Sequence, residues 1–167
     1  MSDSEPEIII LVDSNDEITS HKDRKLCGAD DIYRVSALWI TNSAGKILLA
    51  RRHKNKKHHP RKWGPAVAGT VNKGETYSEN IIQEAKEELG IVDVSFKVGP
   101  KTAPSGKFKH FTQWFIAIID AEIDYFTIQE DEVEEIKWWN KEELIKSFKK
   151  NPEEFLSKVR KYLEMLD

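Results

Sequence analysis

One stretch of this 167-residue chain, Gly69 to Ile91, constrains the fold more than any other. It reads GTVNKGETYSENIIQEAKEELGI, a glycine-containing loop followed by a run that is typical of a helix. Glu84, Glu87 and Glu88 occupy positions i, i+3 and i+4 of this run, so one helical face presents all three carboxylates. Carboxylates this close repel one another and tend to bind protons or a cation, and hard divalent ions such as Mg²⁺ prefer oxygen ligands. The stretch therefore predicts a metal-binding helix.

The sequence also marks both ends of this helix. Thr76 and Glu79 form a T-x-x-E capping box at its start, and Gly90 stands where a left-handed residue ends a helix. Apolar residues at helical spacing should gather on one side, namely Ile81, Ile82, Ala85 and Leu89. The helix can then pack on a sheet while its acidic edge lines an opening.

Length and composition predict one domain, residues 1–167, with its own core. The chain is 39% hydrophobic and 33% charged, which fits a soluble globular protein. A single cysteine, Cys27, excludes an internal disulfide and is compatible with a reducing compartment. Residues 1–7 do not resemble a signal peptide, and no apolar run reaches membrane-spanning length. We therefore expect a cytoplasmic protein without a membrane partner.

Charge is distributed unevenly, although the formal net charge is only −3. Residues 51–62 contain seven Lys or Arg and no acid, whereas residues 120–135 contain eight acids and no base. A basic segment and acidic clusters in one fold suit an anionic substrate that is bridged by a metal ion. On charge alone, two solvated loops of opposite sign explain the pattern about equally well. A nucleic-acid partner is not expected.

The rest of the chain is predicted to form strands around the central helix, with further helices at the C-terminus. Strands are expected at residues 7–13, 33–41, 46–52, 66–68, 94–98, 108–120 and 133–139. Further helices should run from Lys141 to Phe148 and onward from Pro152, which suits a first helical position. The expected organisation is a disordered segment at 1–6, an N-terminal hairpin extension at 7–30, a core at 32–150 and a C-terminal helix at 152–166.

The central stretch resembles the signature of the Nudix hydrolases, G-x5-E-x7-R-E-U-x-E-E-x-G-U, where U is a bulky aliphatic residue. Seven fixed positions match at the right spacing: Gly69, Glu75, Glu84, Glu87, Glu88, Gly90 and Ile91. Such a match is far more specific than a lone glycine motif. The resemblance covers residues 32 to about 150. It implies an α/β (α+β) fold, a Nudix-type α/β/α sandwich with a mixed β-sheet.

Two positions depart from the signature. Ala85 is smaller than the pattern describes, and Gln83 stands in place of its arginine. In the family that arginine braces the loop–helix and orients the neighbouring glutamate. Glutamine donates hydrogen bonds but supplies neither charge nor a bidentate fork. Two outcomes stay open: weaker catalysis, or compensation by another cation such as Lys86 or a residue of the 51–62 loop.

Residues 46–90, together with QEDEVEEIKWW at 129–139, resemble a branch near isopentenyl-diphosphate isomerase. That enzyme needs a cysteine just before the signature loop and histidines that complete a metal site. Ala68 stands at the cysteine position, Gly69-Thr70 stands where a histidine is expected, and Cys27 lies too far upstream to substitute. Isomerase activity is therefore disfavoured.

The resemblance implies that Glu84, Glu87 and Glu88 hold Mg²⁺, or Mn²⁺ in its place, with the Gly69 carbonyl as a further ligand. The same three glutamates are the catalytic candidates, one of them as the base that activates water. The resemblance makes three other residues structural parts of the signature, namely Glu75, Gln83 and Gly90.

Candidates outside the signature come from the two charged segments. Glu132 and Glu134 are alternatives for a further acid that completes the metal shell. Arg51 and Arg52 are candidates for contact with substrate phosphate. Because neighbouring residues on a strand face opposite sides, only one of the two arginines should reach it. The expected partner is a small-molecule diphosphate, and a homodimer is compatible with the sequence.

Three functions are consistent with these residues. The leading one is a Mg²⁺-dependent hydrolase that cleaves a diphosphate linkage in a nucleoside diphosphate derivative or a similar organic diphosphate. Gln83 suggests an alternative, a catalytically weak or inactive binding or regulatory module on the same scaffold. The third, an isopentenyl-diphosphate isomerase-like enzyme, is disfavoured by the absent cysteine. The signature handles only the diphosphate, so the sequence does not identify the substrate.

Overall fold

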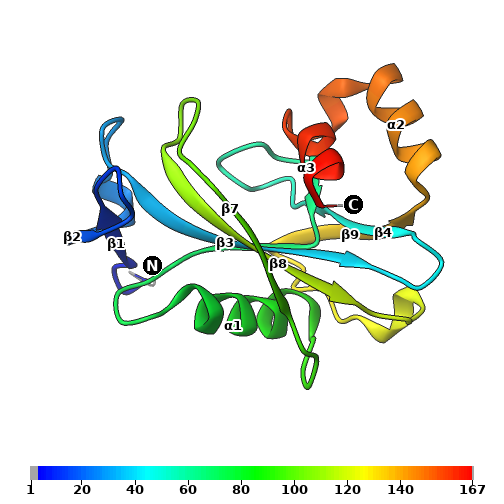
Figure 1. Cartoon of the computed structure of the whole chain (residues 1–167), viewed down its shortest axis with the longest axis horizontal. Helices are drawn as coiled ribbons and strands as arrows, with labels where there is room; N and C mark the ends of the chain where they lie inside the picture. The colour runs from blue at the N-terminus through cyan, green and yellow to red at the C-terminus, as the bar shows by residue number, and fades with distance from the viewer. Residues whose placement is uncertain (1–3, 167) are drawn as a thin grey trace.

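Within residues 4–166, the part of the chain that the computed structural model describes, a nine-stranded mixed β-sheet separates two helical layers (Figure 1). One face is covered by α1 (Tyr77–Leu89) and the other by α2 (Lys141–Lys150) and α3 (Val159–Leu166). The strands are β1 (Ile8–Val12), β2 (Ile18–Asp23), β3 (Tyr33–Thr41), β4 (Ile47–Arg52), β5 (Trp63–Pro65), β6 (Val67–Thr70), β7 (Lys97–Thr102), β8 (His110–Ile118) and β9 (Val133–Trp139). The predicted α/β/α sandwich is confirmed. None of the helices in this part of the chain has the length and apolarity to cross a membrane.

Strand β3 organises the sheet because it pairs along both of its edges. On one edge β8 runs parallel to it, from the pair Tyr33–His110 to the pair Thr41–Ile118. On the other edge, β1, β6 and β4 pair in turn with its start, middle and end, all antiparallel. β4 then continues between β5 and β9. The central β3 thus links the strand that leads into the acidic helix, β6, to the rest of the sheet.

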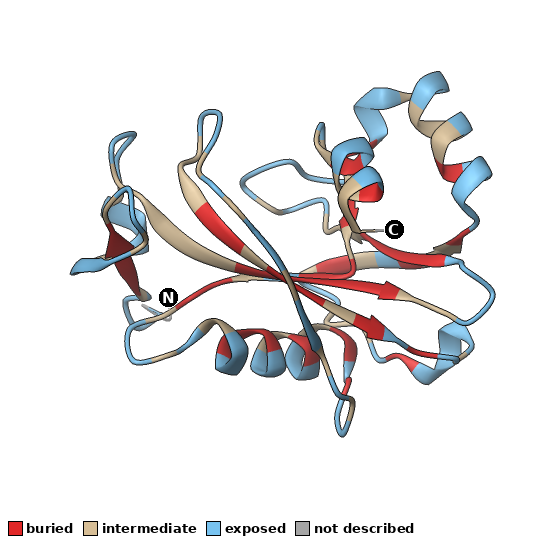
Figure 2. Ribbon diagram, in the orientation of Figure 1, coloured by how far each residue is buried: buried red, intermediate tan, exposed pale blue. Residues whose placement is uncertain are grey.

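Alternation along β3 directs its side chains into two separate cores. Leu38 and Ile40 pack toward α1, whereas Ala37 and Trp39 pack toward the C-terminal helices. Figure 2 shows buried residues along the middle of the sheet and on the inner side of α1. α1 contributes Ile81, Ala85 and Leu89 to its core. Ile82, predicted on the same side, is 58% exposed because it lies one step further around the helix.

Both predicted ends of α1 are confirmed. The Thr76 hydroxyl accepts a hydrogen bond from the Glu79 backbone N–H (3.2 Å), and the Glu79 carboxylate accepts one from the Thr76 N–H (2.8 Å). Gly90 adopts a left-handed conformation at φ +66° and donates its N–H to the Lys86 carbonyl (3.0 Å). These local bonds set the length of the helix, and therefore the positions of the glutamates along it.

The C-terminal segment corrects the predicted helix at 152–166. Pro152–Glu154 form only a 3₁₀ turn, Phe155 is extended (φ −122°, ψ 152°), and α3 begins at Val159. Phe155 forms a parallel bridge with Trp63, and the Leu156 N–H donates to the Trp63 carbonyl (2.9 Å). Burial of the Phe155 ring in the core beneath α2 and α3 overrides the helical pattern of the sequence.

Several strand boundaries also move, two of them by more than two residues. The strand expected at 94–98 is β7, at Lys97–Thr102, because its register is set by pairing with β8, with Lys97 opposite Ile116. The N-terminal hairpin continues through β2 to Asp23 and then forms a 3₁₀ turn at Arg24–Leu26. Of the segment predicted to be disordered, residues 1–3 lie outside the described part of the chain, and residues 4–6 have no regular secondary structure.

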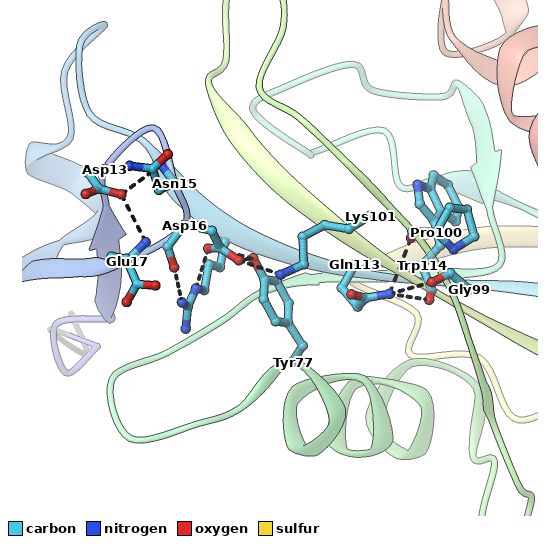
Figure 3. A network of polar contacts seen from close by, with 11 residues as sticks. Asp13, Asn15, Asp16, Glu17, Tyr77, Gly99, Pro100, Lys101, Gln113 and Trp114 are labelled. Atoms are coloured by element: carbon cyan, nitrogen blue, oxygen red, sulfur yellow. Dashed lines mark hydrogen bonds and ion pairs between the residues drawn. The ribbon is translucent and has the colours of Figure 1, made fainter.

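The N-terminal hairpin is fastened to α1 and to β7 through Asp16 (Figure 3). Its carboxylate accepts hydrogen bonds from Arg34 Nε (2.7 Å), the Tyr77 hydroxyl (3.0 Å) and Lys101 Nζ (2.6 Å). The Asp16 backbone carbonyl accepts a further bond from Arg34 Nη2 (2.6 Å). The Arg34 guanidinium and the Lys101 ammonium both lie over the Tyr77 ring. Four segments of the chain thus meet at one carboxylate.

Asp16 should stabilise the fold in its ionised form. Burial alone would raise the pKa of Asp16, but hydrogen bonds from Lys101, Arg34 and Tyr77 outweigh burial and hold the pKa below its usual value. Its side chain is 10% exposed, so these interactions are only weakly screened by solvent. A lowered folded-state pKa contributes stability that is present above the unfolded pKa and lost as pH falls through the folded one.

We predict that Asp16→Ala lowers the free energy of unfolding by about 2 kcal/mol at pH 7, because it leaves the half-buried Arg34 guanidinium and the Tyr77 hydroxyl without their carboxylate partner. Asp16→Asn removes the charge but keeps a residue type that tolerates the φ of +62° found here, so it separates the charge effect from backbone strain. Urea denaturation measures both variants. Unchanged stability of Asp16→Ala would contradict the role given to this carboxylate.

Candidate active site

Glycine at position 69 lets an acidic side chain of α1 lie directly against the backbone of β6. A Cβ atom at Gly69 would stand 2.5 Å from both Cγ and Cδ of Glu84 and 2.8 Å from its Oε1. Contacts that short do not occur between real atoms, so any side chain at this position would displace the Glu84 carboxyl group. The close approach explains why glycine is needed here, and it brings backbone and carboxylate oxygens to one place.

Glu84 and Glu88 form a partly buried carboxyl pair one turn apart on α1. The two carboxyl groups are close enough for each to influence the pKa of the other. Burial raises the pKa of both groups well above the usual value, and repulsion by neighbouring carboxylates, Glu132 among them, adds to the increase. The pair therefore favours a shared proton, or a cation in its place, over two free negative charges.

Glu87, the third predicted glutamate, is placed differently. It is exposed, and its Oε1 accepts a hydrogen bond from Gln83 Nε2. The residue that replaces the arginine of the signature therefore contacts Glu87 rather than Glu84. The structure brings two of the three glutamates together, Glu84 and Glu88, and keeps the third on the outer edge of the same helical face.

Of the two candidates for a further acid, Glu132 lies nearer to this pair. It precedes β9, and its charge acts on both Glu84 and Glu88. Its carboxylate accepts a hydrogen bond from Lys56 Nζ, and its backbone carbonyl accepts one from the His53 N–H (3.0 Å). These contacts tie the basic segment to the acidic one at the edge of the carboxyl pair.

Glu134, the other candidate, forms ion pairs with arginines instead. Its Oε2 lies 3.2 Å from Arg51 Nε, and its Oε1 lies 3.8 Å from Arg61 Nε. Arg51 also reaches Glu135 (2.9 Å) and lies over the ring of Trp63, which belongs to the core beneath the C-terminal helices. Arg51 is therefore directed away from α1.

Arg52 points to the other face of β4, toward the carboxyl pair. Burial lowers the pKa of its guanidinium, while the charges of Glu132 and Glu88 oppose that shift. Arg52 Nε donates a hydrogen bond to the His58 carbonyl (3.0 Å), which holds the start of the basic loop. Alternation along the strand thus separates the two arginines, and Arg52 is the one beside the acidic helix.

Glu75 supports the loop between β6 and α1. Its Oε2 accepts hydrogen bonds from the Asn72 N–H (2.9 Å) and from Asn80 Nδ2 (3.0 Å). Asn80 is 1% exposed and also donates to the Thr70 carbonyl (3.1 Å). Sequence reasoning missed Asn80 and Lys56. For Asn80 the available signal was a polar residue directly before the apolar positions of the helix; for Lys56 no signal separated it from its basic neighbours.

The residues around the carboxyl pair fit a hard divalent cation. Glu84 and Glu88 supply carboxylate oxygens, and their raised pKa values show that two negative charges at this place are unfavourable without a cation or a proton. The absence of a side chain at Gly69 places the β6 backbone against the Glu84 carboxyl group. Within residues 4–166, no three His, Cys, Asp or Glu side chains already stand in a metal-binding arrangement. Each of the two potential third ligands has another partner, because Glu87 is hydrogen-bonded to Gln83 and Glu132 to Lys56.

Comparisons with known proteins agree with this geometry. The family model of the NUDIX domain matches residues 32–159. An uncharacterized Nudix hydrolase of Yersinia pestis is 30% identical over 144 residues, which cover 83% of this chain and 75% of that protein. One of Listeria monocytogenes is 30% identical over 138 residues, which cover 80% of each. These names do not test the branch near isopentenyl-diphosphate isomerase, which stays a prediction.

Solved structures show the same fold. A crystal structure of a Deinococcus radiodurans protein matches with a TM-score of 0.84 at 22% identity, covering 96% of this chain and all of that one. The NUDIX domain of Shewanella oneidensis NrtR, solved in complex with ADP ribose, matches with a TM-score of 0.55 at 18% identity, covering 75% of this chain and 82% of that one. At these identities the likeness concerns the fold alone.

We predict that Glu88→Gln stabilises the metal-free protein at pH 8. Because the folded-state pKa lies above the unfolded one, the folded chain binds more protons between the two values, and its stability falls as pH rises through that window. Glutamine carries no charge to repel Glu84, so the free energy of unfolding should rise by about 1 kcal/mol. The gain should vanish near pH 4, where the unfolded chain is protonated as well.

Thermal and urea unfolding at both pH values measure this effect. Glu87→Gln is the matched control, because Glu87 lies on the same helix but is exposed and hydrogen-bonded to Gln83. Equal effects of the two substitutions at pH 8 would show that the carboxyl pair carries no particular repulsion.

Proposed function

The chain belongs to the Nudix hydrolase family, enzymes that cleave diphosphate bonds, and we propose that it is a Mg²⁺-dependent hydrolase of a nucleoside diphosphate derivative or a similar organic diphosphate. The observation that carries this proposal is the Glu84–Glu88 carboxyl pair against Gly69, with Arg52 facing it. The ADP ribose of the NrtR complex, itself a nucleoside diphosphate derivative, supports the substrate class by analogy.

In this proposal Glu84 and Glu88 hold the metal ion, and Glu87 or Glu132 joins them once it leaves its present hydrogen bond. Mn²⁺ is an alternative ion for the same oxygen ligands. When bound, the ion supplies positive charge that neutralises the diphosphate oxygens and the developing charge at phosphorus. The Gly69 carbonyl, beside the Glu84 carboxyl group, is proposed as a further ligand.

The side chains around the ion would divide the remaining work. A carboxylate of the glutamate set accepts the proton of the water that attacks phosphorus. The Arg52 guanidinium donates hydrogen bonds to a phosphate oxygen, which positions the diphosphate and stabilises the added charge of the transition state. Glu75 and Asn80 keep the loop after Gly69 in place, so the carboxylates and the strand backbone stay aligned. Gly90 ends the helix that carries all three glutamates.

We propose a small-molecule diphosphate as the partner and the cytoplasm as the place of action, consistent with the single cysteine. Formation of a homodimer stays a prediction.

We predict that Glu84→Gln and Glu88→Gln each lower kcat by at least about 100-fold on a diphosphate that the wild type hydrolyses, because each removes an oxygen ligand that carries charge. A panel of nucleoside diphosphate derivatives and simpler organic diphosphates, assayed with Mg²⁺ and with a chelator, measures this loss. Hydrolysis that survives both substitutions and the chelator would overturn the metal assignment.

The same panel separates the second candidate, a binding or regulatory module with little or no turnover. Gln83 favours that candidate, because it contacts Glu87 without supplying the charge of the usual arginine. Saturable binding of a diphosphate in calorimetry, without release of product by the wild type, would identify the module and exclude the hydrolase.

We predict that Arg52→Gln raises KM about tenfold, whereas Arg51→Gln leaves KM within about twofold of the wild type. The two substitutions remove the same charge from neighbouring positions, but only Arg52 faces the carboxyl pair. Steady-state kinetics on one substrate, with urea denaturation to account for stability, measure the difference. Equal increases in KM would contradict the assignment of Arg52.

A further inference from the structure

Two loops that are distant in sequence meet around one aromatic ring. The loop at 53–62, after β4, contacts the loop at 103–109, between β7 and β8, and both project from the sheet face that carries α3 (Figure 1). The ring centroid of Phe108 lies 4.8 Å from that of His58 and 6.2 Å from that of His59, both edge-on. Lys107 Nζ lies 5.6 Å from the same ring centroid. We call His58, His59, Lys107 and Phe108 the imidazole cluster.

Cationic side chains from several segments act on this cluster. Burial lowers the pKa of His58, and the charges of Lys57, Arg24, Arg52 and Lys107 lower it further. Burial and cationic neighbours, Lys62 and Arg52 among them, likewise lower the pKa of His59. Burial and the nearby positive charges thus both disfavour the imidazolium form of the two histidines, and the charges gathered here repel one another. An anion bound there would relieve that repulsion and restore the imidazolium form.

The position of the cluster is fixed relative to the proposed active site. Arg52, which faces the carboxyl pair, donates its Nε–H to the His58 carbonyl (3.0 Å), and its own carbonyl accepts the Arg61 N–H (3.0 Å). Lys56 of the same loop is hydrogen-bonded to Glu132, whose charge acts on Glu84 and Glu88. The loop that carries the imidazoles therefore begins at the edge of the diphosphate site.

Resting on the proposed function, we propose that His58, His59 and Lys107, gathered around Phe108, form a second anion subsite that binds a phosphoryl group of the substrate other than the diphosphate that is cleaved. The substrate class is then an organic diphosphate whose far end carries an additional phosphate. Imidazolium and ammonium N–H groups suit phosphate oxygens as charge-assisted donors, and the Phe108 ring packs against both imidazoles and holds them side by side.

The surroundings favour a small ligand over a nucleic acid. Residues 120–135 contain eight acids and no base, and this segment joins the basic loop through the Lys56–Glu132 contact. A long polyanion that reached the cluster would be repelled by the acidic segment next to it, whereas one phosphate group would not extend that far.

The test uses the metal-free full-length protein and inorganic tripolyphosphate, observed through the imidazole signals in NMR. The signals of His58 and His59 should shift saturably, and the pKa of both should rise on binding. The signal of His21, on β2, should not move and serves as the internal reference. Because this measurement needs neither metal nor turnover, it decides the subsite even if no substrate of the hydrolase is found.

Substitutions locate the binding. His58→Gln and Lys107→Gln should each weaken tripolyphosphate binding about fivefold, since each removes one charge-assisted contact. Lys150→Gln, which removes the same charge from the exposed end of α2, should leave binding unchanged. The Arg52 side chain is hydrogen-bonded to the backbone carbonyl of His58, so His58→Gln leaves that hydrogen bond available.

Three results would overturn the subsite: no saturable shift of the two imidazole signals, equal weakening by Lys150→Gln, or tighter binding of a single-stranded oligonucleotide or of anionic vesicles than of tripolyphosphate. Failure of hydrolysis with these shifts intact would reject the hydrolase and keep the subsite. Hydrolysis of diphosphates with no response of the imidazoles would reject the subsite alone. On hydrolysed substrates, His58→Gln should raise KM only for those that carry the additional phosphate.

Discussion

The repulsion between two partly buried carboxyl groups is the interaction on which the site depends. Glu84 and Glu88 are held together by the helix that carries them, and Glu84 lies against the β6 backbone because residue 69 has no side chain. Keeping two such charges close is unfavourable, and the packing of Ile81, Ala85 and Leu89 on the sheet must offset it. The packing of the apolar side of α1 therefore offsets the repulsion along its acidic edge, and a shared proton or a bound cation would reduce that repulsion.

The parts of the fold that could be predicted are those whose signals are local. The capping box at Thr76 and the left-handed Gly90 are specified by neighbouring residues, and both ends of α1 were predicted correctly. The strand at 33–41 followed its β-branched and aromatic run without change. The helix expected from Pro152 failed at Phe155, because that ring is buried beside Trp63 by a contact some ninety positions away along the chain. A pattern within a short stretch of sequence carries no information about a contact between residues so far apart in the chain.

The candidate site likewise has features that one short segment predicts and features that depend on contacts between distant segments. The spacing of the glutamates and of Gly69 is a property of one short segment, and it predicted Glu84, Glu87 and Glu88 on one helical face, whereas only the side-chain contacts separate Glu87 from the other two. Strand alternation predicted that one of two arginines would face the pair, but only the register of β4 shows that it is Arg52. The contact between Lys56 and Glu132 joins segments far apart in sequence, and no local pattern distinguishes these two from the other charges around them.

The replacement of the signature arginine by Gln83 can be understood from how α1 is held at its two ends. At its start, the Tyr77 carbonyl accepts a hydrogen bond from Ser36 Oγ (2.8 Å), and the Tyr77 hydroxyl donates to Asp16 (3.0 Å). At its end, the Glu88 carbonyl accepts the Gln129 N–H (2.9 Å), and the Leu89 carbonyl accepts the Thr127 N–H (3.1 Å).

Both sets of bonds come from outside the signature, from β3, the N-terminal hairpin and the segment before β9. They fix the rotation and the axial position of the helix, and hence the direction in which Glu84 and Glu88 point. We therefore expect that the loss of an arginine's bidentate fork at position 83 bears mainly on Glu87, the glutamate that Gln83 contacts. On this interpretation, the hydrogen bonds at the two ends of α1 hold the carboxyl pair in place without a contribution from the residue at position 83.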